Sequence, residues 1–65
     1  MTMQARNLNT IEEFTIGTED RVFLALAPNE VEPAWYYQIR GNAEAAGPFV
    51  DRRAAEEDYE SLDTE

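Results

Sequence analysis

The alternation of side chains is clearest over residues 35–40, whose sequence is WYYQIR. The two alternating sets are Trp35, Tyr37 and Ile39 on one side and Tyr36, Gln38 and Arg40 on the other. A period of two places successive side chains on opposite faces of a strand, so that one set is buried and the other faces water. The pattern predicts a β-strand over these residues.

Residues 11–17, IEEFTIG, also alternate, which predicts an earlier strand with Phe14 and Ile16 directed inward. A helix that starts over residues 10–13 competes with this interpretation, because Thr10 is an acceptable N-cap and glutamate suits a first helical turn. The TIG sequence that follows would end such a helix at once. We therefore favour the strand.

Residues 21–27, RVFLALA, predict a further strand after a turn over residues 17–20. Apolar residues fall on both of its faces, with Val22, Leu24 and Leu26 on one and Phe23 and Ala25 on the other. A strand that is apolar on both sides is typical of a position inside a sheet. We expect this strand to be central.

Prolines bound the next segment, residues 28–33, PNEVEP. Because proline lacks a backbone donor and restricts the residue before it, we expect an exposed acidic loop here. A polar, alanine-rich connection over residues 41–47 then lets the chain reverse. Residues 49–50 follow as a short fourth strand or as an extended bridge into a helix.

The C-terminal helix begins after Asp51, whose carboxylate can accept hydrogen bonds from the free N–H groups of the first turn. Its apolar stripe consists of Ala55, Tyr59 and Leu62, which are spaced at i, i+4 and i+7. The pattern predicts a helix that runs to about Leu62 and packs through this stripe.

Together these elements predict an α+β fold, namely an antiparallel three- to four-stranded meander with one C-terminal α-helix packed on one face. We expect a flexible N-terminal lead over residues 1–9, with Leu8 as a candidate core contact. A single domain over residues 10–62 and a frayed C-terminus over residues 63–65 complete the predicted organisation.

The expected core lies between the sheet and the helix. Its predicted members are Phe14, Ile16, Val22, Leu24, Leu26, Trp35, Tyr37, Ile39, Phe49, Ala55, Tyr59 and Leu62. Phe23 and Tyr36 then lie on the reverse of the sheet, which we expect to be partly open.

The composition excludes several kinds of chemistry. The 65 residues contain no cysteine and no histidine, so the chain lacks disulfides, thiolate nucleophiles and the commonest metal ligand and general base. No phosphate-cradling glycine loop, serine nucleophile elbow or calcium loop occurs, and the one serine, Ser61, lies near the end of an acidic helix. We expect a protein that is not an enzyme and that holds no metal or cofactor.

No targeting or membrane segment is evident in the chain. The opening MTMQARNLNT lacks the apolar run of a signal peptide, and no later segment approaches the roughly 20 apolar residues of a transmembrane helix. We expect a cytoplasmic protein.

The charge balance indicates the kind of partner. The chain has 14 Asp and Glu residues against 5 basic residues, all of them arginine, for a formal net charge of -9. Nucleic acid and anionic membranes would be repelled over a Debye length of about 8–10 Å. A basic protein surface is the natural counterpart, and the sequence leaves open whether the chain is a monomer or a homodimer.

Two acidic surfaces are candidates for such contacts. Around the helix, the side away from the apolar stripe carries Glu56, Glu57, Glu60 and Asp63. This side is either an ordinary solvated helix surface or an anionic ridge that docks on Lys and Arg of a partner. Glu30 and Glu32 of the 28–33 loop form a second acidic patch.

Aromatic and basic residues offer further contacts. Exposed Tyr36 and Phe23 beside acidic loops would have the anatomy of a protein interface, in which aromatic anchors have a polar rim. Arg52 and Arg53 open the helix against its dipole, so we expect local partners for them among Asp58 and Glu56 at helical spacing.

The C-terminal half carries a W-Y-Y, turn, G-P-F and capped-helix pattern. The residues involved are Trp35, Tyr36, Tyr37, Gly47, Pro48, Phe49, Asp51, Ala54 and Ala55. This pattern resembles small bacterial and phage domains of unknown function and, distantly, the second type of GYF domain. The resemblance implies a small interaction module without catalytic activity. The Gly-Tyr-Phe signature itself is missing, so binding of proline-rich peptides is not implied.

By size and charge alone, the chain also resembles phage DNA-mimic inhibitors, including anti-CRISPR proteins. Our leading hypothesis is therefore a non-catalytic acidic protein that occupies a basic, nucleic-acid-binding surface of a protein partner. The alternative is a small structural or interaction module that uses an exposed aromatic sheet face around Tyr36 and Phe23 and can self-associate. In that case the acidity serves solubility.

Overall fold

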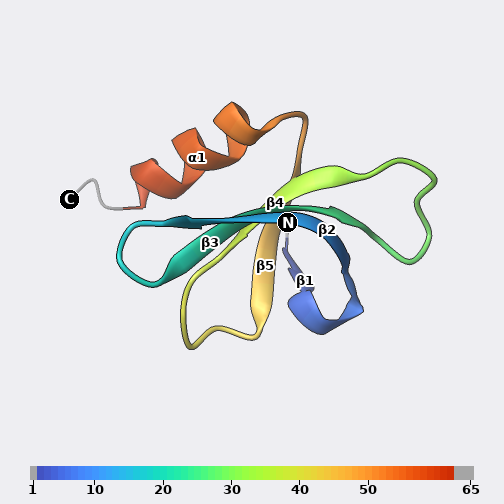
Figure 1. The fold of residues 1–65 in the computed structure, drawn as a ribbon, viewed down its shortest axis with the longest axis horizontal. Helices are drawn as coiled ribbons and strands as arrows, with labels where there is room; N and C mark the ends of the chain where they lie inside the picture. The colour runs from blue at the N-terminus through green and yellow to red at the C-terminus, as the bar shows by residue number, and fades with distance from the viewer. Residues whose placement is uncertain (1, 63–65) are drawn as a thin grey trace.

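The computed structural model describes residues 2–62 and shows an antiparallel sheet with one helix against it (Figure 1). The elements in chain order are β1 (Thr2–Gln4), the 3-10 helix η1 (Ala5–Asn7), β2 (Asn9–Ile16), β3 (Asp20–Leu26), β4 (Ala34–Gln38), β5 (Glu44–Phe49) and α1 (Arg52–Ser61). The strand order is β1-β5-β4-β3-β2, and every neighbouring pair is antiparallel. The predicted α+β class with a C-terminal helix is confirmed, with five strands in the sheet instead of three or four.

The fifth strand comes from the segment that was expected to be a flexible lead. β1 pairs with β5, with Met3 opposite Ala45, and Leu8 is buried. β5 also begins earlier than expected, at Glu44, because its first residues pair with β1 as well as with β4. Met1 and residues 63–65, which include the expected frayed end, lie outside the described residues.

A short connection between the two edges of the sheet forces the sheet to curl. β1 and β2 are the edge strands, and only residues 5–8 join them. Four strand spacings in a flat sheet would separate the edges by about 19 Å. Five Cα steps reach at most about 18 Å when fully extended, and the 3-10 turn of η1 shortens them further. The sheet must bend to bring its edges closer, and residues 2–8 then cover one of its faces.

The face under α1 carries the core that the alternation predicted. Val22, Tyr37 and Ala55 are buried there. The half-buried residues packed against them are Phe14, Ile16, Trp35, Ile39, Ala46, Phe49 and Tyr59. Leu24 and Leu26 were also expected in this core, but they are half-buried and do not belong to this cluster. Leu62 was expected there too but is 52% exposed, because α1 ends at Ser61 and Leu62 is its C-cap.

The reverse face is closed, which corrects the expectation that Phe23 and Tyr36 are exposed. Phe23 is 0% and Tyr36 2% exposed, and their rings stack with centroids 5.9 Å apart. Leu8 is buried in the same cluster, and Met3 and Ala5 pack against it. The physical reason is the curl of the sheet, which brings residues 2–8 over this face and removes both aromatic rings from water.

Two tyrosine–carboxylate hydrogen bonds fasten α1 to the sheet. The Tyr37 hydroxyl of β4 donates to Asp58 of α1 at 2.6 Å, and the Tyr59 hydroxyl of α1 donates to Asp20 of β3 at 2.5 Å. As predicted, Asp51 is the N-cap, and its carboxylate accepts from the Ala54 N–H at 2.8 Å. These bonds hold the helix in one position over its apolar contacts.

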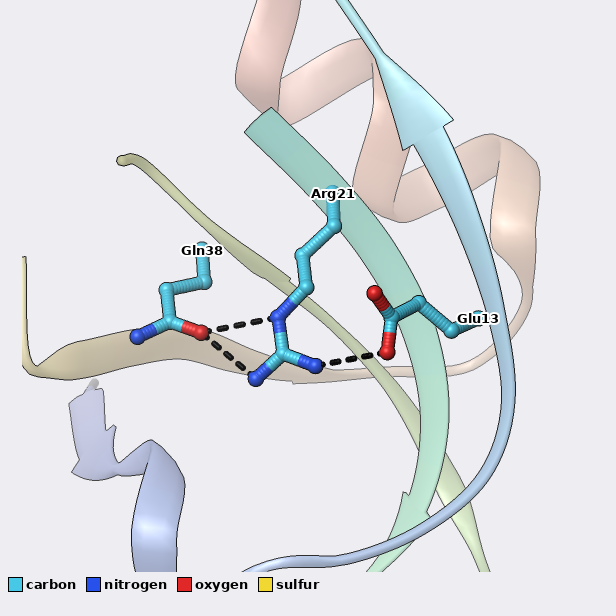
Figure 2. Close-up of polar contacts among 3 residues, drawn as sticks. All are labelled: Glu13, Arg21 and Gln38. Carbon is cyan, nitrogen blue, oxygen red and sulfur yellow. Dashed lines mark hydrogen bonds and ion pairs between the residues drawn. The ribbon is translucent and has the colours of Figure 1, made fainter. Parts of the chain in front are cut away.

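An arginine locks the register of three strands on the reverse face. Arg21 of β3 donates from Nε and Nη2 to Gln38 Oε1 of β4 at 2.8 and 2.6 Å, and from Nη1 to Glu13 Oε1 of β2 at 2.9 Å (Figure 2). Its guanidinium also lies 4.3 Å from the centroid of the Phe23 ring. A one-residue slip of any of these strands would break the cluster.

We expect Gly47→Ala to lower the free energy of unfolding by about 1–3 kcal/mol. Gly47 has a φ of 146°, and a Cβ there would lie 2.5 Å from Tyr36 Cδ2 and 2.8 Å from the Trp35 carbonyl oxygen. Gly41→Ala is the matched control, since Gly41 also has a positive φ, 84°, but has open space around it. Urea unfolding measures both; equal losses would contradict a packing role for Gly47.

Alkaline pH should destabilise the fold through Tyr37. Burial, followed by the hydrogen bond to Asp58 and its charge, raises the pKa of Tyr37 from 10.0 to about 12. The unfolded chain therefore loses this proton first, so the stabilisation is complete below about pH 10 and is lost as pH rises to about 12.

In Tyr37→Phe, unfolding free energy should fall less steeply than in wild type between about pH 10 and 12. The variant should also be less stable at neutral pH by about 0.5–1.5 kcal/mol, because its hydrogen bond to Asp58 is missing. Urea unfolding across this pH range measures both effects. Parallel curves for the two proteins would show that Tyr37 is not the group responsible.

Candidate partner-binding surface

Most of the positive charge of the chain is already paired internally. Arg21 contacts Glu13 at 2.9 Å, Arg52 contacts Glu56 at 2.6 Å and Arg53 contacts Glu57 at 3.0 Å. Arg40 forms an ion pair with Glu19. Four of the five arginines thus pair with a glutamate of the same chain, so the net charge of -9 rests on the other carboxylates.

The predicted helix ridge is partly neutralised by these pairs. Glu56 and Glu57 each pair with the arginine one turn earlier, as the spacing i, i+4 allows. The expected partner Glu56 is confirmed for Arg52, whereas Arg53 pairs with Glu57 and Asp58 bonds to Tyr37. Arg52 in addition lies 4.1 Å from the centroid of the Phe14 ring, which holds it against the sheet.

At the end of the helix, Glu60 is exposed and lies on the ridge beyond both ion pairs. Asp63, the fourth residue of the predicted ridge, lies outside the described residues. Along the described part of α1, the ridge therefore has two carboxylates paired with arginine, Glu56 and Glu57, followed by the exposed Glu60. Its net charge is lower than the sequence suggested.

The acidic side chains of the 28–33 loop differ from Glu56 and Glu57 in their lack of an arginine partner among residues 2–62. It joins β3 to β4 and is the green segment that extends from the end of the sheet in Figure 1. Glu30 and Glu32 are both exposed, and among residues 2–62 no arginine forms an ion pair with either. A tight turn shapes the loop, because the Glu30 N–H donates to the Ala27 carbonyl at 3.1 Å.

An open groove of about 510 Å³, which we call the loop groove, lies beside these two glutamates. Its lining includes Ala27, which follows β3, Ala34 and Tyr36 of β4, Pro48 of β5, and Val50, which follows β5. Tyr36 is buried, so its ring closes the groove toward the reverse-face core. Of the residues that line the groove, the charged ones are Glu30 and Glu32.

The structure thus brings together three of the residues that the sequence singled out, namely Glu30, Glu32 and Tyr36. Phe23 lies beneath, stacked on Tyr36 and out of contact with solvent. The helix glutamates form a separate surface. Because Phe23 and Tyr36 are both buried, they do not form the exposed aromatic pair that the alternative hypothesis required.

Sequence reasoning missed the apolar residues around the groove. Val31, between the two glutamates, is 93% exposed, and Val50 is 89% exposed. Val31 is an isolated apolar residue in the proline-bounded polar segment 28–33, where turn chemistry does not require an apolar side chain, and Val50 follows Phe49 just before the polar cap of the helix. That mismatch is the signal that could have identified Val31.

The charge of Glu30 reaches the phenol that closes the groove. The pKa of Tyr36 is raised above its usual 10.0, first by desolvation and then by the negative charge of Glu30. The loop groove therefore has a negative potential at its apolar base as well as at its rim. A cationic side chain would be attracted to it, and an anion would be repelled.

Residues 2–62 contain neither a candidate metal site nor a helix that could cross a membrane. No group of three or more Asp or Glu side chains is arranged to hold a metal ion there. Within the same residues, no helix has the length and apolar character needed to cross a membrane. No protein-family model, curated protein or solved structure matched the chain.

Removing the Glu30 charge should lower the pKa of Tyr36. In Glu30→Gln the desolvation remains, so this pKa should stay above its ordinary value while moving toward it. NMR titration of tyrosine rings labelled with carbon-13 measures the change. Glu12→Gln, which removes an exposed carboxylate on β2, is the control, and an equal shift in both variants would contradict a local effect.

Proposed function

We propose that this chain is a non-catalytic acidic binding protein that occupies a basic surface of a protein partner. The partner is of the kind that would otherwise hold nucleic acid, so the chain acts as a DNA-mimic inhibitor in the cytoplasm. Carboxylates take the positions of phosphates on the partner's Lys and Arg side chains. The proposal includes no catalytic step and no direct contact of this chain with nucleic acid or membrane.

The observation that supports the proposal is the internal pairing of four of the five arginines. Each of these pairs uses one arginine and one of the 14 acidic side chains, so the pairs leave the formal net charge of the chain at -9. A net negative charge of this size disfavours the compact state, because the like charges repel one another. Binding to a basic surface would relieve that repulsion.

Of the two acidic surfaces, we assign the main role to the loop pair Glu30 and Glu32. Glu56 and Glu57 already hold Arg52 and Arg53, so docking them on a partner would first break existing contacts or bring two like charges along. Glu60, which is exposed beyond both ion pairs, is a secondary contact. The loop pair offers its full charge to a partner, next to an apolar groove.

The self-association hypothesis required exposed Phe23 and Tyr36, and both are buried. That hypothesis therefore lacks the aromatic surface on which it depended. The acidic-docking hypothesis predicts steep dependence on salt, because counterions compete for both partners.

The test is a capture experiment with the immobilised protein and a nuclease-treated bacterial lysate at low and high salt. Three variants each remove two carboxylates and change the formal net charge from -9 to -7: Glu30→Gln with Glu32→Gln, Glu57→Gln with Glu60→Gln, and Glu12→Gln with Glu19→Gln. The last pair is the control for net charge; it also removes the Glu19 partner of Arg40. Captured proteins are then purified and tested for nucleic-acid binding and for its displacement by the wild-type chain.

We expect a nucleic-acid-binding protein to be retained at low salt and released at high salt, with the loop variant weakening binding by about tenfold and the control by less than about twofold. Larger loss in the helix variant than in the loop variant would move the contact to α1. The proposed function would be rejected if the captured proteins were retained equally at low and high salt. It would also be rejected if they kept their nucleic acid when the chain binds.

A further inference from the structure

The loop groove has the size and composition of a site for a short protein segment. Its volume of about 510 Å³ lies within the range of pockets that enclose a compact ligand. Its lining is apolar apart from two carboxylates, and it is open along the surface rather than enclosed. An extended or helical segment can enter such a groove with one face and leave the other in water.

The conformation of the groove is supported by the core. Tyr36 stacks on Phe23, and Gly47 lies so close to the Tyr36 ring that any larger side chain would collide with it. Ala27 is buried in the same cluster, and Ala34 and Met3 pack against it. A site whose base belongs to a packed core loses little side-chain entropy when it binds.

Charge decides what kind of segment fits. Glu30 and Glu32 are the charged residues of the lining, and neither is paired with an arginine of the described chain. An acidic or phosphorylated segment would place like charges side by side. A segment with Arg or Lys next to its apolar residues would instead pair its cations with the two glutamates.

Two exposed valines extend the apolar surface beyond the groove. Val31 projects from the loop between the glutamates, and Val50 lines the groove and follows β5. Each is almost fully exposed, which leaves apolar area to be covered by an occupant. Apolar area next to uncompensated charge matches an amphipathic segment rather than a purely cationic one.

We propose that the loop groove binds a short amphipathic basic segment of a partner protein, with an apolar side chain in the groove and flanking Arg or Lys on Glu30 and Glu32. This inference deepens the proposed function, on which it rests, by naming the chemistry that the partner must present. Recognition then depends on an apolar contact as well as on charge. A partner surface that is only basic would bind more weakly.

The test uses three blocked synthetic peptides of equal length: alternating Arg and Leu, alternating Arg and Ser, and alternating Glu and Leu. Binding to the full chain is followed by amide chemical shifts in NMR, which give both the affinity and the location of each peptide. We expect the Arg-Leu peptide to bind about tenfold more tightly than the Arg-Ser peptide and the Glu-Leu peptide not to bind. The largest shifts should fall on Ala27, Glu30, Ala34 and Val50.

Variants separate charge from apolar contact. Glu30→Gln with Glu32→Gln should weaken the Arg-Leu peptide by about tenfold, and the charge-matched control Glu12→Gln with Glu19→Gln by less than about twofold. Val31→Ser with Val50→Ser, at two nearly fully exposed positions, keeps the charge and should weaken this peptide while leaving the Arg-Ser peptide unchanged.

The inference is overturned if the shifts map to α1, if all charge variants act alike, or if the Arg-Ser peptide binds as tightly as the Arg-Leu peptide. Failure here can be distinguished from failure of the proposed function. Peptide binding in the groove without a captured nucleic-acid-binding protein supports the groove and rejects the DNA-mimic function. The opposite outcome is that a salt-sensitive partner is captured and is lost in the loop variant, while no peptide binds in the groove. That result supports the proposed function and rejects the amphipathic segment as the ligand.

Discussion

The adjacent tyrosines of β4 anchor both halves of the structure. Because successive side chains of a strand point to opposite faces, Tyr36 enters the reverse-face core and Tyr37 enters the core under the helix. Tyr36 stacks on Phe23, while Tyr37 stacks on Phe49 and donates to Asp58. A chain of 65 residues without disulfides has little apolar area to bury, and using both faces of one sheet makes the most of it.

The two ends of the reverse face of the curled sheet differ in how their charged side chains are paired. At one end of the reverse face, Arg21 hydrogen-bonds to both Glu13 and Gln38 (Figure 2). Its guanidinium also lies over the Phe23 ring. Toward the other end, the chain leaves β3 through the 28–33 loop and leaves β5 at Val50; Glu30, Glu32 and Val50 border the loop groove. At the first end Arg21 is paired with Glu13, whereas at the second end Glu30 and Glu32 have no ion pair with an arginine among residues 2–62. This difference in pairing, rather than the number of acidic residues, is what led us to propose the loop as a docking surface.

Local patterns in the sequence were sufficient to predict β2, β3, β4 and α1 and the faces of their side chains. The alternation of residues 35–40 and the Asp51 cap were confirmed, because a period of two and a capping carboxylate act over a few residues of chain. The assignment of Phe23 and Tyr36 to the reverse of the sheet was also correct, but their expected exposure was wrong. Residues 2–8 show no period, and their role as β1 and as a cover depends on pairing with β5, which no local pattern reports.

The sequence by itself determined the α+β class, the faces of the strands, the C-terminal helix and the excess of negative charge, since each follows from residue type and short-range spacing. Only the tertiary structure decided which apolar face was covered, which glutamates kept an arginine beside them and where a groove formed. Those outcomes depend on distances between segments far apart in the chain, such as β1 with β5 and the 28–33 loop with the residues after Gly47. The physical reason is that burial and ion pairing act through space, whereas the pattern of a sequence describes neighbours along it.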